Sequence, residues 1–127
     1  EKAEDLGPAF DGAVKQRADA VLVGLGAVIQ NNIDHVVALV TRHRLPSVFN
    51  SREFVVAGGL MAYGVSYPDS YRRAASYIDK IFKGAKPGEL PVEQITTFEL
   101  SINGRTAKAL GLGIPQSLLL RADRVIQ

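Results

Sequence analysis

The sequence predicts an α/β fold in which a mostly parallel sheet is flanked by helices. Three observations lead to it. Short apolar runs alternate with longer stretches whose apolar residues recur at helical spacing. Such alternation is typical of βαβ units, and their right-handed crossovers place helices on both faces of a sheet. The length of 127 residues, with 46% hydrophobic and 22% charged, suits one domain with a real core.

The sequence of the first half of the chain predicts three strands, each associated with a helix. Apolar residues at helical spacing favour helices over 5–18 and 27–43, and a short helical stretch ends at Ala57 before Gly58-Gly59. The runs between them are short and rich in valine or other apolar residues, which is typical of buried strands. The expected strands are 20–23, 45–49 and 60–65.

The second half predicts further helices and one strand. An amphipathic helix is expected over 69–83, with Gly84 as its C-cap, followed by a connector rich in Pro and Gly. Phe98, Leu100 and Ile102 alternate with polar residues, which predicts a strand over 96–102. The remaining expected elements are a helix over 106–110, a loop over 111–115 and a last short helix over 116–125.

Composition excludes several classes of function. The net charge is only +2 and no basic patch is present, so no nucleic-acid partner is expected. Cysteine is absent. The two histidines, His35 and His43, lack the close spacing of metal ligands and are expected at the surface. Neither a metal nor another cofactor is therefore predicted. No nucleophile elbow, phosphate-binding loop or carboxylate pair occurs, which argues against an enzyme. No apolar segment is long enough to span a bilayer, and no signal peptide opens the sequence.

The first candidate ligand-binding segment is Gly24-Leu25-Gly26, between a predicted strand and a predicted helix. The dinucleotide fingerprint requires a further glycine where Ile29 stands, so a nucleotide site is not favoured. The simpler interpretation of the glycines is a tight strand-to-helix turn. The free backbone N–H groups at a helix start can nevertheless receive a polar group of a ligand.

The second candidate segment is Asn50-Ser51-Arg52, just past the carboxyl end of a predicted parallel strand, where open α/β sheets bind ligands. Its side chains can donate hydrogen bonds to a carboxylate or hydroxyl group. An ordinary helix N-cap at Asn50 or Ser51 is an equally good interpretation. Tyr63 adds an aromatic face and a hydroxyl, unless it belongs to a simple buried strand.

Three stretches, taken in order, resemble one known family. They are 51–64, 80–94, and 103–115 followed by 118–123. Together they resemble the ABC transporter substrate-binding proteins that include tryptophan- and tyrosine-type importer components. The resemblance implies a type I periplasmic-binding fold with two Rossmann-like lobes, of which this chain would be the C-terminal one.

The resemblance also implies a division of the chain. Residues 1–65 and 96–127 would form the C-terminal lobe, and residues 66–95 would return to an N-terminal lobe that is not in this sequence. The helix in that middle segment would then need another partner. We expect it to pack on a second copy of the chain by segment swapping, or to refold against the C-terminal lobe.

The function implied is capture of a small-molecule solute, such as an amino acid or an aromatic or organic acid, and its delivery to ABC permease subunits. The full protein would then be periplasmic or anchored outside the cytoplasmic membrane. Many members carry an aspartate in the first loop, where this chain has Gly24-Leu25-Gly26-Ala27, so the resemblance does not imply recognition of an ammonium group by this loop. The alternative is the effector-binding domain of a ligand-responsive regulator or sensor, which shares the lobe architecture.

Overall fold

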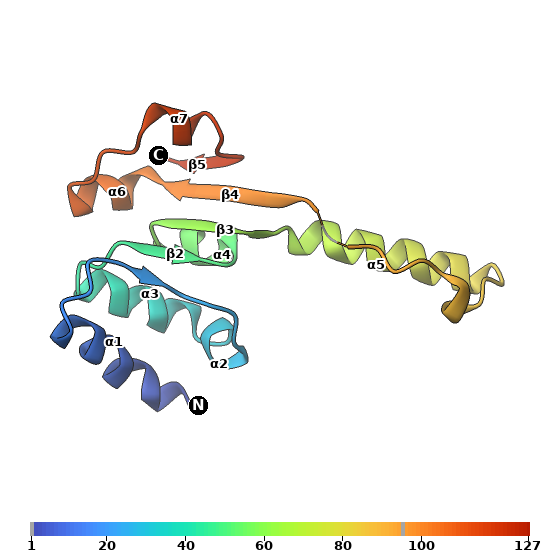
Figure 1. Ribbon diagram of the computed structural model, residues 1–127, viewed down its shortest axis with the longest axis horizontal. Coiled ribbons are helices and arrows are strands. Elements are labelled where there is room, and N and C mark those ends of the chain that lie inside the picture. Colours follow the sequence, from blue (N-terminus) through green and yellow to red (C-terminus); the bar gives the residue numbers. More distant parts are fainter. Residues whose placement is uncertain (1, 95) are drawn as a thin grey trace. The chain divides into compact units, whose positions relative to one another are not determined.

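The computed structural model describes residues 2–94 and 96–127 (Figure 1). Their contacts divide the chain into two compact units. Unit 1 contains Glu1–Gly64 together with Glu99–Gln127, and unit 2 contains Val65–Phe98. Unit 1 carries the sheet and the core.

The sheet has the strand order β1-β2-β3-β4-β5. The strands β1, β2 and β3 are mutually parallel, and β4 is parallel to β5. The second pair runs opposite to the first three (Figure 1). The end of β4 lies beside the start of β3, where the Asn103 N–H donates to the Leu60 carbonyl at 2.8 Å. The predicted α/β fold with a mostly parallel sheet is confirmed, with this reversal added. The strand bounds are β1 Val21–Leu22, β2 Ser47–Phe49, β3 Met61–Val65, β4 Phe98–Asn103 and β5 Arg124–Ile126.

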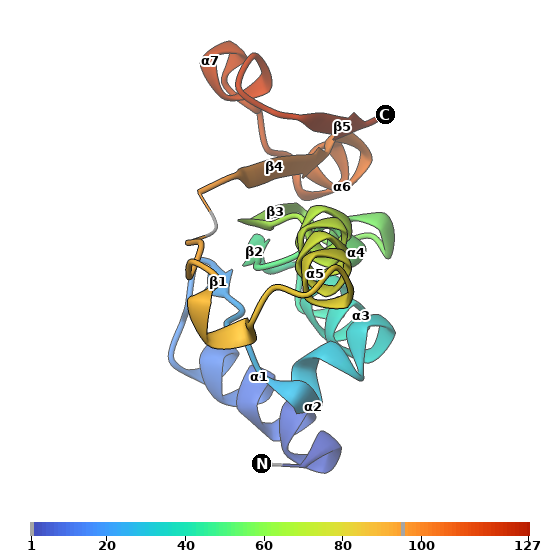
Figure 2. The ribbon, with the colours of Figure 1, turned by 90° about the vertical axis from the view of Figure 1, so that its right-hand side faces the viewer.

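Helices cover both faces of this sheet. In Figure 2, α3, α4 and α6 lie on one face and α7 lies on the other. The core forms beneath the first group, where the rings of Phe49 on β2 and Phe54 on α4 stack with centroids 4.6 Å apart. The helix bounds in unit 1 are η1 Ala3–Asp5, α1 Leu6–Lys15, α2 Ala27–Gln30, α3 Ile33–Arg42, α4 Arg52–Val56, α6 Gly104–Leu110 and α7 Gln116–Leu119.

Two sequence predictions about helices are wrong. The expected helix over 27–43 is broken between α2 and α3, because the Asn32 side chain donates to the Val28 carbonyl at 2.7 Å and its backbone leaves the helical region. The expected helix over 116–125 ends at Leu119, and Arg124–Ile126 pairs with β4 as β5. Asp123 anchors this strand through two hydrogen bonds to Leu100. Its carboxylate accepts from the Leu100 N–H, and its backbone N–H donates to the Leu100 carbonyl.

Asn103 joins the second half of unit 1 to the first. Its side-chain oxygen accepts from the Thr106 N–H at 3.1 Å and so caps α6. Its side-chain amide donates to the Val55 carbonyl at the end of α4, also at 3.1 Å. Together with the backbone bond to Leu60, these contacts make a buried asparagine the junction of β4, α4, α6 and β3.

Unit 2 consists of α5 Tyr67–Phe82, the turn η2 Pro87–Glu89 and the flanking chain. Gly84 follows the C-cap residue Lys83 in a left-handed conformation with φ 101°, so α5 ends one residue before the glycine predicted as its C-cap. The Tyr77 hydroxyl donates to the Pro91 carbonyl at 2.6 Å, and desolvation followed by the Glu93 carboxylate raises its pKa. Within the described ranges, no helix has both the length and the apolar character needed to cross a membrane.

Candidate ligand-binding edge

The candidate site is the edge of the sheet at which β1, β2 and β3 end, called the exit edge here. Because the three strands are parallel, with Val21 beside Ser47 and Val48 beside Met61, the segments that follow β1 and β2 emerge on the same side. The structure therefore brings Gly24-Leu25-Gly26 and Asn50-Ser51-Arg52 to one edge. Tyr63 is placed differently: it lies inside β3 rather than in a following loop, and its side chain is 59% exposed.

The first loop leaves open space at its glycines. A Cβ on Gly24 would meet no atom within 4 Å, and a Cβ on Gly26 would meet only the Ile29 side chain at an ordinary 3.7 Å. Gly26 also has an extended backbone that any residue adopts. Neither packing nor conformation demands glycine here, so the tight-turn interpretation does not account for the sequence. The adjoining Leu25 is 78% exposed and adds apolar surface to this open position.

Replacing Gly24 by alanine is expected to change the free energy of unfolding by no more than about 0.5 kcal/mol, because the new methyl group meets open space. The same methyl group is expected to weaken binding of a ligand seated on this loop severalfold. Thermal unfolding and an NMR titration on the same sample measure the two effects. Gly113→Ala is the matched control, since its Cβ also meets nothing within 4 Å but lies outside the exit edge. If the Gly24→Ala and Gly113→Ala variants bound the ligand with equal affinity, Gly24 would not be part of the binding site.

The second loop holds polar groups without protein partners. In the described part of the chain, both polar atoms of the Asn50 side chain and the Ser51 hydroxyl are buried and make no hydrogen bond. Ser51 occupies the N-cap position of α4, yet its side chain makes no capping bond, so the N-cap interpretation is wrong for that hydroxyl. A buried polar group without a partner costs about 1–3 kcal/mol. These groups are the strongest candidates on this edge for hydrogen bonds to a ligand.

Gly64 fixes the position of the second loop. A Cβ on Gly64 would lie 1.7 Å from the Asn50 carbonyl oxygen and 2.7 Å from its carbon, so only glycine lets β3 run directly against this backbone. The close approach holds Asn50 at the exit edge beside β3. Gly64 is thus a residue that positions the second loop of the exit edge.

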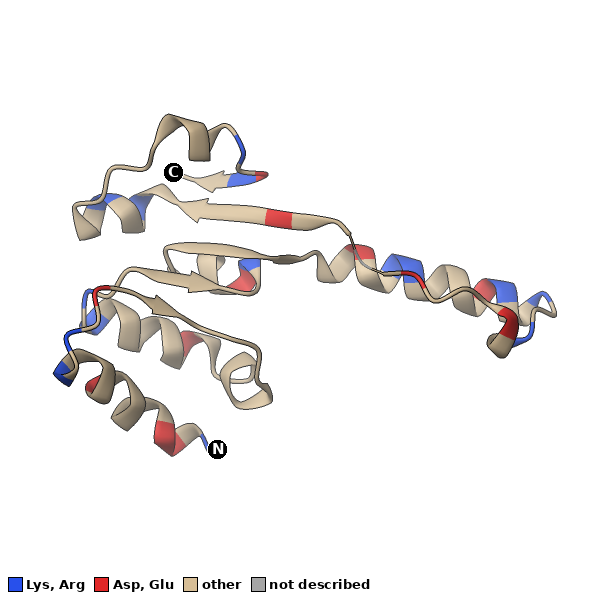
Figure 3. Ribbon diagram, in the orientation of Figure 1, with Lys and Arg blue, Asp and Glu red and all other residues tan. Residues whose placement is uncertain are grey.

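Arg52 was expected to act together with Asn50 and Ser51, but its side chain lies among residues of β4 and β5. It lines a hollow of about 330 Å³ with Glu99, Ser101, Asp123 and Arg124, and its Nε lies 3.7 Å from a Glu53 carboxylate oxygen. Charged segments of α4, β4 and β5 accordingly lie at the same end of the sheet in Figure 3. Sequence reasoning missed residues 123–124 because it predicted a helix where β5 lies. It missed residues 99–101 because it did not predict the reversed direction of β4.

The acidic and histidine side chains do not gather into a metal centre. Among residues 2–94 and 96–127, no group of three His, Cys, Asp or Glu side chains could hold an ion. The His43 side chain is mostly buried, contrary to the expected surface position, and its Nε2 lies 3.2 Å from Asp11 Oδ1. His43 therefore links the end of α3 to α1, and His35 is exposed as predicted.

Parallel strands that end at one edge in glycine-containing and polar loops define an α/β ligand-binding domain. Comparison with family models identifies which one. The model described as ABC transporter substrate binding protein matches residues 2–126, so the chain belongs to this family and the suspected resemblance is confirmed. The family is one of binding proteins and not of enzymes, in agreement with the sequence prediction.

Solved structures show the same fold. A conserved domain protein from Vibrio cholerae has a TM-score of 0.87 at 23% identity, with 98% of this chain and 42% of that chain covered. An ABC domain from Streptococcus pneumoniae in complex with L-Trp also has a TM-score of 0.87, at 26% identity with 98% and 43% covered. The ligand-free, open structure of CD0873, an adhesive substrate binding protein from Clostridium difficile, has a TM-score of 0.67 at 18% identity, with 99% and 42% covered. A comparison with curated proteins gave no match. The chain thus spans less than half the length of the structures it matches.

Proposed function

We propose that this chain forms one wall of the solute site in the substrate-binding component of an ABC-type importer. The exit edge would close on a small molecule against a second lobe, and the component would hand the solute to permease subunits outside the cytoplasm. The family match supports the transport role. The observation that carries the site is the set of buried, unpartnered polar groups on Asn50 and Ser51 at the edge where β1, β2 and β3 end.

The domain assignment follows as part of this proposal. Residues 1–65 and 96–127 belong to the C-terminal lobe, and 66–95 return to the other lobe. The division into units at 64/65 and 98/99 supports this assignment. So do Tyr71, Ile78 and Phe82 of α5, apolar side chains that are more than half exposed. Their association with a second copy through segment swapping stays a prediction, which light scattering tests.

The chemistry of the edge favours a ligand with both polar and apolar parts. Asn50 and Ser51 offer uncharged donors and acceptors, while Leu25 and Tyr63 offer exposed apolar surface. The relative from Streptococcus pneumoniae is in complex with L-Trp, which has this character. We therefore propose an amino acid or an aromatic or other organic acid as solute. Because the first loop lacks a carboxylate, a solute with an ammonium group would find its counter-ion elsewhere.

L-tryptophan titrated into ¹⁵N-labelled chain tests the site. We expect shifts at Gly24, Leu25, Gly26, Asn50, Ser51, Arg52 and Tyr63, with millimolar or weaker affinity because one lobe supplies only part of the contacts. The double variant Asn50→Ala with Ser51→Ala is expected to lose these shifts without loss of stability, since the replaced groups make no hydrogen bond in the described structure. The Gln116→Ala variant is a control on α7, outside the exit edge.

Two outcomes would contradict the proposal. Shifts confined to residues away from the exit edge would show that the loops after β1 and β2 do not bind the solute. Unchanged shifts in the Asn50→Ala, Ser51→Ala double variant would show that the unpartnered groups have no part in binding. A separate outcome, clear binding at micromolar concentration, would disprove the expected weakness of the isolated chain while leaving the site in place.

A further inference from the structure

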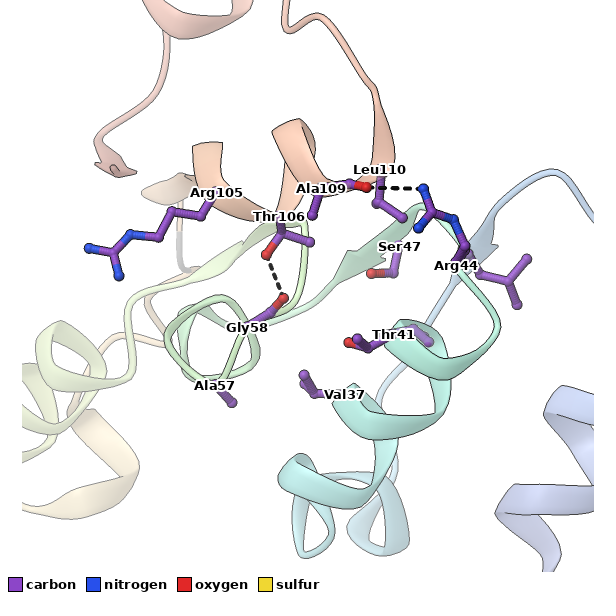
Figure 4. A pocket seen from close by; sticks show the side chains of 12 residues that line it. Val37, Thr41, Arg44, Ser47, Ala57, Gly58, Arg105, Thr106, Ala109 and Leu110 are labelled. Atoms are coloured by element: carbon purple, nitrogen blue, oxygen red, sulfur yellow. Dashed lines mark hydrogen bonds between the residues drawn. The ribbon is translucent and has the colours of Figure 1, made fainter.

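A second hollow lies at the opposite end of the sheet from the exit edge, inside unit 1. It has a volume of about 420 Å³, which is within the range of about 300–1,000 Å³ typical of small-molecule sites. Its walls are the end of α3, the chain entering β2, the chain entering β3, and α6 (Figure 4). Since these segments precede β2 and β3, the hollow is separate from the loops that follow those strands.

The floor and sides of the hollow are mainly apolar. Val37 and Val40 of α3, Leu45 before β2 and Leu110 of α6 line it. Val40 and Leu45 belong to the buried core of unit 1, so this wall is rigid and already formed. An apolar group that enters the hollow gains contact with packed side chains and leaves water, which favours binding.

The charged lining residues are both arginines. Arg44 and Arg105 line the hollow, and none of the described residues around it is an Asp or Glu. Arg44 Nη2 donates to the Ala109 carbonyl at 3.0 Å, as the dashed line in Figure 4 shows. Arg105 Nε donates to the Gln127 carbonyl at 2.6 Å. A guanidinium has five N–H donors, so Arg44 keeps donors for an anion after making its bond. The Arg105 side chain extends away from the other labelled side chains in Figure 4. The Ala109 bond holds the Arg44 guanidinium at the rim and lowers the entropy lost on binding.

The backbone of Arg44 has an uncommon conformation. Arg44 follows α3 with φ 53°, in a left-handed position where glycine is favoured and a side chain costs about 1–2 kcal/mol. Arg17 has the same conformation after α1, with φ 58°, so the backbone alone does not identify a site. The surroundings of the two arginines differ. Arg44 lines the hollow and donates a hydrogen bond to the Ala109 carbonyl on α6, whereas Arg17 does not line the hollow.

We propose that this hollow binds a small amphipathic organic acid, whose carboxylate pairs with Arg44 and whose apolar part lies against Val37, Val40 and Leu110. Such a site is independent of the importer function and of the exit edge. A bound acid bridges α3 and α6, which come from distant parts of the sequence. Such binding stabilises unit 1 in proportion to the logarithm of the acid concentration above its Kd.

Hexanoate is the probe, with hexan-1-ol and hexylamine as matched compounds of the same chain length. Titration into ¹⁵N-labelled chain is expected to give saturable shifts at Val40, Arg44, Ala109 and Leu110, with little change at Gly24–Gly26 or Asn50–Ser51. Hexanol and hexylamine are expected to bind about tenfold more weakly or worse, since they lack a carboxylate for the guanidinium.

The Arg44→Gly variant separates binding from folding. Glycine suits the left-handed backbone, so the variant is expected to fold with an unchanged or raised Tm, yet to bind hexanoate about tenfold more weakly. Arg17→Gly is the matched control and is expected to keep full hexanoate affinity. The proposal is overturned if hexanoate gives no saturable shifts, if they map to the exit edge, or if Arg44→Gly binds as tightly as the original chain.

Discussion

Replacing Gly64 by alanine is expected to destabilise unit 1 by about 3 kcal/mol or more, and to displace the second loop of the exit edge. The added Cβ would lie 1.7 Å from the Asn50 carbonyl oxygen, a separation that no real structure tolerates. Either β3 or the Asn50 backbone must move, and both are held by the pairing of β2 with β3. Denaturant unfolding followed by circular dichroism measures the loss.

The matched control for this substitution is Gly24→Ala, at the same edge but with open space around its Cβ. Its free energy of unfolding is expected to stay within about 0.5 kcal/mol of the original. Where Gly64→Ala still folds, amide shifts at Asn50 and Ser51 report displacement of the loop. If Gly64→Ala proved as stable as Gly24→Ala, with the Asn50 amide unshifted, β3 would not lie against this carbonyl.

Replacing Asn103 by alanine is expected to cost about 2–4 kcal/mol, the second large effect. The substitution removes the cap on the Thr106 N–H and the donor to the Val55 carbonyl, both at 3.1 Å, of which the first bond is partly buried and the second is buried. Loss of an N-cap costs about 1 kcal/mol, and a buried carbonyl left without its donor costs about 1–3 kcal/mol. Chemical denaturation again gives the magnitude.

Asn32→Ala provides a comparison, because its side chain donates to a single carbonyl, that of Val28, in a partly buried position. We expect a loss of about 1 kcal/mol there. Hydrogen exchange adds a second readout: Asn103→Ala is expected to speed exchange at Thr106 and in α6 first. Equal losses in the two variants would mean that Asn103 does not act as a junction between the halves of unit 1.

Local sequence patterns predicted much of this fold. Short apolar runs ended by Gly24 or Asn50 located β1 and β2, and apolar residues at helical spacing located α1, α3 and α5. The spacing of apolar residues over 27–43 did not reveal the break between α2 and α3. The bond from Asn32 to Val28 is a local side-chain contact that competes with the helix ladder and leaves no mark on apolar periodicity.

Non-local pairing explains the larger errors. Arg124–Ile126 is only three residues long and becomes a strand by pairing with Ser101–Asn103, so its own sequence carries little signal. The reversed direction of β4 is likewise a property of its neighbours, since alternation reads the same in either direction. Polar loops after parallel strands could be placed at one edge in advance. The hollow that Arg52 shares with Glu99 and Asp123 could not, because it requires β5.

The sheet is bounded by two short strands. β1 has two residues and β5 has three, while the longer β3 and β4 lie inside with neighbours on both sides. A foreign chain therefore finds few free backbone groups with which to extend the sheet, and Arg124 adds a charge at one border. Lateral addition of strands, the usual beginning of fibre growth, has little to start from in this unit. The brevity of these two outer strands therefore limits strand-to-strand pairing between copies of this unit, although it does not bear on association through α5.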